Sequence, residues 1–282
     1  MIKKRLAKDK IIFWSICILA VLTAVPLLAI LGEVFFRGYD QLTWSFFTEP
    51  TPTAYKAMKA IEAGEPIPGG IANGIIGTIL MLGMAAVVAI PMGILCGAFL
   101  AENSKNRFAQ TVSYLTDLLQ GTPSVIIGII TYVWVVVPMK GYSAIAGSVA
   151  LCIMMMPLII RSTEETLKIL PASLKEAGLA LGGNRAHVMM KVQLPAAFGG
   201  IFTGVLLAIS RVIGETAPLM FTALGCSLIR WSIDKPMSAV PLLIWEFFND
   251  PNLQDLIWGA SLFLLLFVLV LNITAKYIKG TL

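Results

Sequence analysis

Six long apolar stretches decide what this chain can fold into. They run over residues Ile11–Phe36, Ile71–Leu100, Thr111–Met139, Ser143–Ile160, Ala196–Leu224 and Leu253–Ile278. A helix needs about 20 apolar residues to cross the hydrocarbon core of a bilayer, and these stretches are close to that length or longer. Because a backbone in lipid must satisfy its own hydrogen bonds, each stretch predicts one transmembrane helix. The expected fold class is therefore an all-α membrane protein with six transmembrane helices.

The composition excludes other broad classes of protein. Of the 282 residues, 57% are hydrophobic and 13% are charged, whereas a typical soluble domain has about 25% charged residues. The sequence has no P-loop motif for ATP, and its single histidine, His187, cannot form a His-based metal site or catalytic pair. The cysteines are dispersed without metal-ligand spacing. We therefore expect no catalytic residue, metal or cofactor on this chain.

The first apolar stretch follows a basic segment and so resembles a signal peptide. It exceeds the roughly 7–15 apolar residues of a signal peptide, and no A-x-A-like cleavage site follows it. We expect an uncleaved first helix. Residues 1–70 would then form an N-terminal cytoplasmic segment, this helix and an outer loop, added to a membrane core over residues 71–278.

Lysine and arginine gather in the segments that six helices place on one side of the membrane. These residues are Lys3, Lys4, Arg5, Lys8, Lys10, Lys105, Arg107, Arg161, Lys168, Lys175, Arg185, Lys191, Lys276 and Lys279. By the positive-inside rule this side is the cytoplasm, so both termini are expected there. The outer loops, residues 37–70 and 225–252, hold more acidic than basic residues. Glu246, in the second of them, either contacts a binding protein or is solvated, and we expect it to be solvated.

The third apolar stretch contains its own interruption. Gly121-Thr122-Pro123-Ser124 combines turn-forming residues in the middle of the stretch. Asp117 and Gln120 lie just before this interruption. They either line a cavity or lie at the headgroup boundary, and the sequence leaves both interpretations open.

The longest cytoplasmic connection, residues 161–195, contains a predicted helix and turn. Ser173 and Glu176 have the spacing of a capping box at the start of a helix. Gly182-Gly183 then ends the helix where a left-handed backbone is needed. Two interpretations remain open: a connector that lies on the membrane surface, or a short helical hairpin that docks into a partner.

Seven positions of this connection keep a fixed spacing. They are Glu176, Ala177, Gly178, Gly182, Val192, Leu194 and Pro195. This pattern resembles the E-A-A-x3-G-x9-I-x-L-P signature of ABC importer permeases, with glycine for the second alanine and valine for the isoleucine. The resemblance extends over about residues 71–278 and implies the type I ABC importer permease fold. It also implies that this loop couples transport to a separate ATPase subunit, which binds ATP and Mg²⁺.

The fifth apolar stretch carries two charged residues, Arg211 and Glu215. An arginine at the bilayer centre costs at least about 2.5 kcal/mol on insertion scales. The i,i+4 spacing predicts that the two side chains share one face of a continuous helix and neutralise each other. One interpretation is a structural ion pair that fixes helix packing. The other is an anion site on a transport path, because the guanidinium group can bind an oxyanion through two hydrogen bonds.

In the second interpretation Glu215 accepts a hydrogen bond from a protonated oxygen, which phosphate has at neutral pH and sulfate lacks. Ser210 and Thr216 then serve as neutral donors. The run R-x-x-G-E-T-A-P-L over residues 211–219 resembles the permeases of phosphate importers. That resemblance implies a heterodimer with a second, related permease, two copies of an ATPase and a phosphate-binding protein.

Several alternatives stay open. The sister permease of the same importer shares several of these motifs, and a permease for another oxyanion would share its architecture. An ATP-independent secondary transporter belongs to another class, and such proteins often contain inverted repeats. We find no second copy of the Arg–Glu segment in the sequence. A further alternative is a membrane enzyme or a purely structural subunit. The enzyme is disfavoured because the sequence shows no cluster of histidine, cysteine or carboxylate residues.

Overall fold

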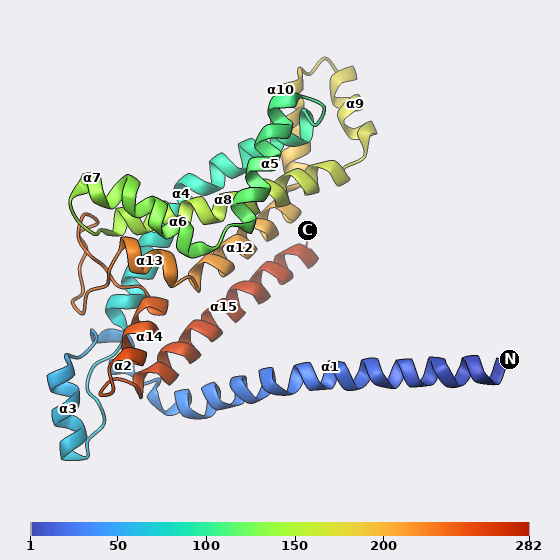
Figure 1. Ribbon diagram of the computed structural model, residues 1–282. Helices are drawn as coiled ribbons and strands as arrows, with labels where there is room; N and C mark the ends of the chain where they lie inside the picture. Colours follow the sequence, from blue (N-terminus) through green and yellow to red (C-terminus); the bar gives the residue numbers. More distant parts are fainter. Residues whose placement is uncertain (1, 282) are drawn as a thin grey trace.

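The computed structural model describes the backbone of residues 2–281, which is helical almost throughout (Figure 1). Its elements are α1 (Ile2–Gly38), η1 (Tyr39–Gln41), α2 (Trp44–Thr48), α3 (Ala54–Ala63), α4 (Ala72–Glu102), α5 (Arg107–Gly121), α6 (Ser124–Thr131), η2 (Tyr132–Val136), α7 (Val137–Met139), α8 (Ala144–Ile169), α9 (Ala172–Ala180), α10 (Arg185–Val188), η3 (Met189–Gln193), α11 (Leu194–Ala196), α12 (Phe198–Ile213), α13 (Ala217–Thr222), α14 (Val240–Asn249) and α15 (Leu256–Thr281). The side chains of residues 1–7, 11 and 278–282 lie outside the described part, and they include Lys3, Lys4, Arg5 and Lys279.

Four helices of the described part are long and apolar enough to cross a membrane unbroken. They are the helices over Lys8–Gln41, Ala72–Glu102, Ala144–Ile169 and Leu256–Tyr277. Two further pairs of helices qualify together but are bent, by 106° between Gly121 and Ser124 and by 73° between Ala196 and Phe198. Counting each bent pair as one span gives the six spans expected from the sequence. The all-helical fold class is confirmed.

Proline and glycine account for the interruptions. Pro123 lacks a backbone N–H and forces Thr122 into an extended conformation, so α5 ends and α6 begins in a new direction. The fifth span was expected to be continuous to Leu224, and this expectation is wrong. Its helix α12 ends at Ile213, and the short helix α13 restarts with Pro218 in its first turn. Pro218 cannot donate a hydrogen bond to the carbonyl group of Gly214, so the helix does not continue through this point.

The core lies where α4, α8 and α12 pack together. Its fully buried residues include Met81, Met155, Ile159 and Ala208. Small residues allow close approach of the helices: a Cβ on Gly97 would lie 2.7 Å from Cβ of Thr163. This use of small residues is typical of helix packing in membranes, where the hydrophobic effect does not drive helices together.

A second, smaller core holds the outer elements. Phe46, Ile71, Leu243 and Phe247 are its largest buried side chains. The helix α14 belongs to it, although the sequence predicts an outer loop over residues 225–252. This helix is ten residues long, too short to span a bilayer.

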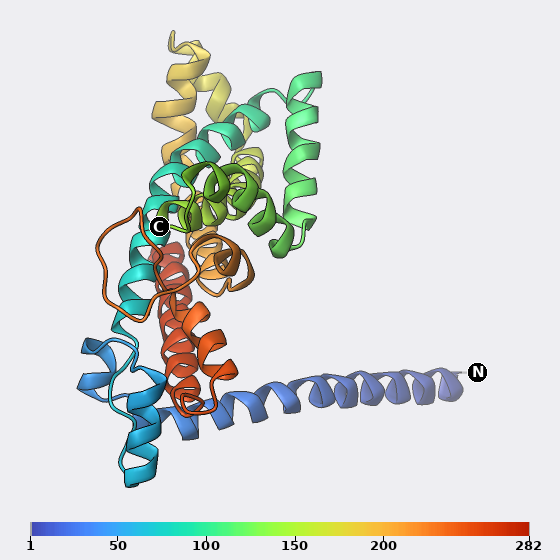
Figure 2. The same cartoon turned by 60° about the vertical axis from the view of Figure 1, so that its left-hand side comes forward.

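Most of helix α1 projects away from the rest of the molecule. Its apolar window is 0% buried, and in Figures 1 and 2 it runs away from the bundle toward the N-terminus. Its C-terminal end contacts α15, where Gly38 packs on Leu262 and the guanidinium group of Arg37 lies 4.9 Å from the ring centre of Trp258.

Candidate functional site

Arg211 and Glu215 lie on either side of the break between α12 and α13. Arg211 is exposed in the last turn of α12, whereas Glu215 lies beyond the helix and is half-buried. The expectation that they share one helix face is therefore wrong, because the helix ends between them. Among the described residues the salt bridges include neither side chain. The guanidinium group of Arg211 is thus not neutralised by the carboxylate expected to pair with it.

The two neutral residues proposed as donors have different surroundings. Ser210 is buried, and its hydroxyl oxygen has no hydrogen-bond partner in the described part. Thr216 is half-buried and its hydroxyl donates to the carbonyl oxygen of Pro241 at 3.5 Å. Roles for Ser210, Thr216, Arg211 and Glu215 in contacting an anion stay predictions.

The cytoplasmic connection forms a compact hairpin of α9 and α10. Gly182 has φ +86°, the left-handed conformation expected from the sequence, and the N–H of Gly183 donates to the carbonyl oxygen of Gly178 at 3.2 Å. The two helices touch at Gly178, where an added Cβ would lie 2.9 Å from Cγ1 of Val188. Asn184 caps α10 by accepting a hydrogen bond from the N–H of His187 at 2.7 Å.

The predicted capping box of α9 is absent. Pro171 occupies the cap position, and no side chain caps this helix. Proline has no side-chain oxygen that could accept a hydrogen bond from the first turn of the helix. Glu176 and Ala177 are exposed on the hairpin, and Lys175 ties it to the end of α4 through an ion pair with Glu102 at 2.6 Å.

Sequence reasoning missed a charged cluster on α8. The fourth span was expected to end at Ile160, but α8 continues to Ile169. Arg161 contacts Asp117 of α5 and donates to Glu164 at 2.6 Å, while Lys168 donates to the other oxygen of Glu164 at 2.6 Å. The spacings Arg161–Glu164 and Glu164–Lys168, i,i+3 and i,i+4, could have indicated a charged helix face.

This cluster lines a polar cavity of about 560 Å³ between α5, α8 and α12. The lining residues are Ser113, Asp117, Gln120, Leu158, Arg161, Ser162, Glu164, Glu165, Lys168, Gly204 and Leu207. Of the two interpretations of Asp117 and Gln120, the structure therefore favours a cavity. Gly204, Leu207 and Arg211 follow an i,i+3,i+7 spacing on α12, so Arg211 continues the face that lines the cavity.

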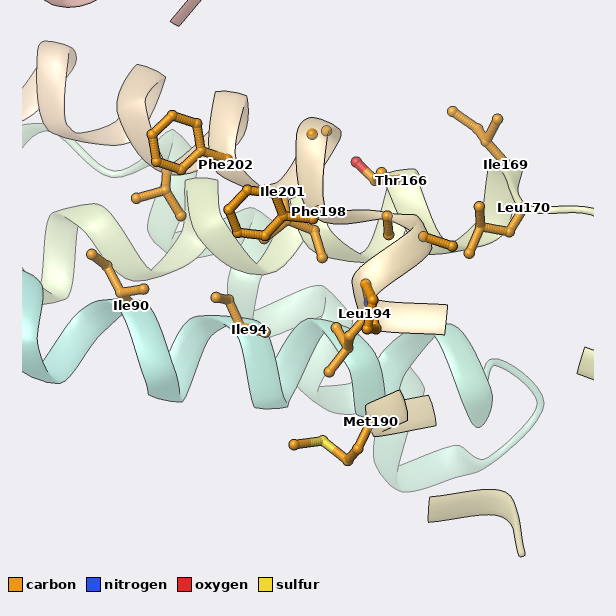
Figure 3. A pocket seen from close by; sticks show the side chains of 16 residues that line it. Ile90, Ile94, Thr166, Ile169, Leu170, Met190, Leu194, Phe198, Ile201 and Phe202 are labelled. Carbon is orange, nitrogen blue, oxygen red and sulfur yellow. The ribbon is translucent and has the colours of Figure 1, made fainter. Parts of the chain in front are cut away.

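A larger groove of about 1060 Å³ is apolar and lies at the bend between α11 and α12 (Figure 3). Ile90, Ile94, Leu194, Phe198 and Phe202 are among the side chains that Figure 3 shows around it. Its lining, within the part of the chain that the structure describes, includes no charged side chain. Its chemistry does not suit an inorganic anion, and Leu194 and Pro195 of the loop signature form part of its wall.

Glu246, expected to be solvated, is instead half-buried in α14. Its carboxylate lies against the backbone of Gly225, which has φ +82°. Burial raises the pKa of this carboxyl from 4.5 to about 7.

Residues 89–281 match the family model described as "Binding-protein-dependent transport system inner membrane component". The chain belongs to this family. As a family member it is a multi-pass protein of the inner membrane and part of a binding-protein-dependent transport system. The matched region includes the hairpin, the cluster around Arg161 and the break at Arg211, whereas α1, α2 and α3 lie before it.

Curated relatives of this chain are permeases of phosphate transport systems. The phosphate transport system permease protein PstA of Haemophilus influenzae is 35% identical over 88% of this chain and 85% of its own length. PstA of Yersinia pestis is 37% identical over 89% and 83%. The probable PstA of Methanocaldococcus jannaschii is 32% identical over 97% and 94%. The phosphate transport permease PstA is thus what the chain resembles over most of its length.

Solved structures confirm the fold. The inward-facing methionine ABC transporter MetNI gives a TM-score of 0.64 at 18% identity, over 74% of this chain and 94% of that one. An amino acid ABC transporter gives 0.55 at 15% identity, over 82% and 100%. At these identities the likeness concerns the fold alone. The family member therefore has the type I ABC importer permease fold expected from its loop signature.

Proposed function

We propose that this chain is the PstA-type permease subunit of an ATP-driven importer of inorganic phosphate. It would form half of the translocation path, with the sister permease PstC forming the other half. The names of the curated relatives favour the PstA position over the PstC position. They also favour phosphate over another oxyanion.

One observation carries the choice of an anion as cargo. Arg211 is exposed at a helix break within a membrane span, on the α12 face that lines the polar cavity, with no carboxylate paired to it in the described residues. An unpaired arginine within a membrane-spanning segment is costly. A tetrahedral oxyanion would offset that cost by accepting two hydrogen bonds from its guanidinium group. The carboxylate of Glu215 would accept a hydrogen bond from a protonated phosphate oxygen.

The energy would come from a partner, since the chain has no nucleotide-binding motif. A dimer of the ATPase PstB, which binds ATP and Mg²⁺, would dock on the hairpin through Glu176, Ala177, Gly178 and Gly182. The phosphate-binding protein PstS would deliver cargo on the opposite side. Leu194 and Pro195 would connect the hairpin to α12.

Phosphate uptake by cells that express the complete transporter tests this proposal. Arg211→Ala should reduce uptake of [³²P]orthophosphate by at least about tenfold, because loss of a charge-assisted bidentate contact costs about 1.5–3 kcal/mol. Glu215→Gln should also reduce uptake. Arg107→Ala is the matched control, since Arg107 is exposed at the start of α5. Normal uptake by both Arg211→Ala and Glu215→Gln would refute the anion site.

A second measurement separates the transporter classes. Proteoliposomes that hold the complex should take up phosphate from the side opposite the hairpin only when ATP is supplied to the side of the hairpin. Uptake driven by an ion gradient without nucleotide would instead identify a secondary transporter.

A further inference from the structure

The guanidinium group of Arg161 uses its two edges in different ways. On one edge, Nε donates to Oδ1 of Asp117 at 2.9 Å, and Nη2 lies 2.5 Å from the same oxygen. Nη2 also donates to the carbonyl oxygen of Ser113 at 2.8 Å. On the other edge, Nη1 donates to Oε2 of Glu164 at 2.6 Å. Arg161 therefore holds two carboxylates, one on α5 and one on its own helix.

These two carboxylates differ in how firmly they are held. The side chain of Glu164 is 7% exposed and its second oxygen accepts a hydrogen bond from Lys168. The side chain of Asp117 is 58% exposed, and within the described residues its contacts are those with Arg161. The side chain of Arg161 is 19% exposed, so solvent screens this pair mainly from the Asp117 side. The Nε and Nη2 atoms of Arg161 thus form an oxyanion site, which the weakly held carboxylate of Asp117 occupies.

The position of this edge connects it to the path proposed above. Asp117, Arg161 and Lys168 line the polar cavity of about 560 Å³, and Arg211 lies on the α12 face that forms its other wall. From Leu207, which lines the cavity, to Arg211 is four residues, or about 6 Å along the helix axis. An anion that leaves Arg211 toward the hairpin side would therefore next meet the Arg161 edge.

We propose that the polar cavity is a second binding site for inorganic phosphate on the transport path, called the station below. There the anion displaces Asp117 from the Nε–Nη2 edge of Arg161. This inference rests on the proposed function. Lys168 supplies a second cation, and Glu164 keeps the guanidinium group in place while Asp117 moves away. Because Asp117 returns when the anion leaves, and Glu165 adds a further negative charge to the cavity wall, the station binds weakly and releases its cargo. A transport path requires sites of this kind.

Equilibrium binding of [³²P]orthophosphate to the detergent-purified transporter, without added binding protein, tests the station. Asp117→Asn removes the competing charge and should lower the Kd about 2- to 5-fold, the factor that corresponds to an exposed ion pair. Arg161→Gln should raise the Kd. The matched control is Glu33→Gln, because Glu33 also pairs with an arginine, Arg37, and its side chain is 50% exposed.

Each outcome has one meaning. If the Kd of Asp117→Asn is equal to or above that of the unaltered transporter, the proposed second phosphate site is wrong. This holds also if Asp117→Asn has a lower melting temperature, which would show that the ion pair is merely structural. The Asp117→Asn result decides the matter even if Arg161→Gln does not assemble. Phosphate uptake by cells with the unaltered chain checks the proposed function separately. If those cells import phosphate and Asp117→Asn leaves the Kd unchanged, the station alone is wrong.

Discussion

Glu246 shows how one residue makes stability depend on pH. Its carboxyl has a pKa of about 7 in the folded protein instead of 4.5. Below pH 4.5 this group is protonated in both states, and stability is at its maximum with respect to it. Between about pH 4.5 and 7 the unfolded state releases the proton first, so stability falls as pH rises.

The expected loss over this interval is about 1–2 kcal/mol, since partial solvent exposure reduces the full effect of the shift. Thermal unfolding of the purified protein between pH 4.5 and 8 measures it. Glu246→Gln should remove this part of the pH dependence, whereas Asp234→Asn, at an exposed outer position, should leave it in place. An identical pH profile for Glu246→Gln and the unaltered protein would contradict the burial of this carboxylate.

At the scale of elements, the hairpin of α9 and α10 depends on a close contact at a glycine, which has no side chain. Gly178 faces Val188 closely enough that an added Cβ would lie 2.9 Å from Cγ1. Gly178→Val should therefore force the two helices apart at a cost of about 1–3 kcal/mol, the usual range for overpacking. If the hairpin docks on the ATPase, this variant should retain assembly of the spans but lose most ATP-driven phosphate uptake.

Ala180→Val is the matched control for this variant, because Ala180 is exposed in the same helix. ATP hydrolysis and uptake are measured together on the same preparation, with the amount of protein in the membrane as a check on folding. Equal loss of uptake in both variants would mean that the contact at Gly178 has no special role.

The elements also show what the sequence predicts well. Apolar length predicted the spans, and Gly121 with Pro123 predicted the break between α5 and α6, because both effects are local. The break after Ile213 was missed, although Gly214 and Pro218 carried the signal, because the surrounding run is otherwise apolar. The extension of α8 past Ile160 was missed for a different reason. Arg161 contacts Asp117 and Ser113 of α5, and such long-range contacts are not visible in a local pattern.

The candidate site follows the same division. The hairpin turn at Gly182 was predicted because a glycine pair after a helix has a local meaning. The prediction of an ion pair between Arg211 and Glu215 was wrong because it assumed a continuous helix. The cavity around Arg161 was missed because it depends on how α5, α8 and α12 pack together.

At the scale of the whole molecule, the hairpin of α9 and α10 lies far from helix α3. Helices α9 and α10 lie at one end of the bundle and α3 lies at the other, as Figure 1 shows. The basic residues predict that the end with α9 and α10 faces the cytoplasm, together with both termini. Helix α3 would then face outward, on the side where a binding protein delivers cargo.

Labelling of single cysteines in intact cells measures this orientation. Cys17, Cys96, Cys152 and Cys226 are free and are first replaced by serine or alanine. A membrane-impermeant maleimide should then label Lys56→Cys on α3 in intact cells with a permeable outer envelope. It should label Arg185→Cys on α10 only after the inner membrane is disrupted. Both positions are exposed, so a difference in labelling reports sidedness and not burial. The reverse pattern would place the hairpin outside, where no ATPase could dock on it, and would contradict both the orientation and the proposed coupling.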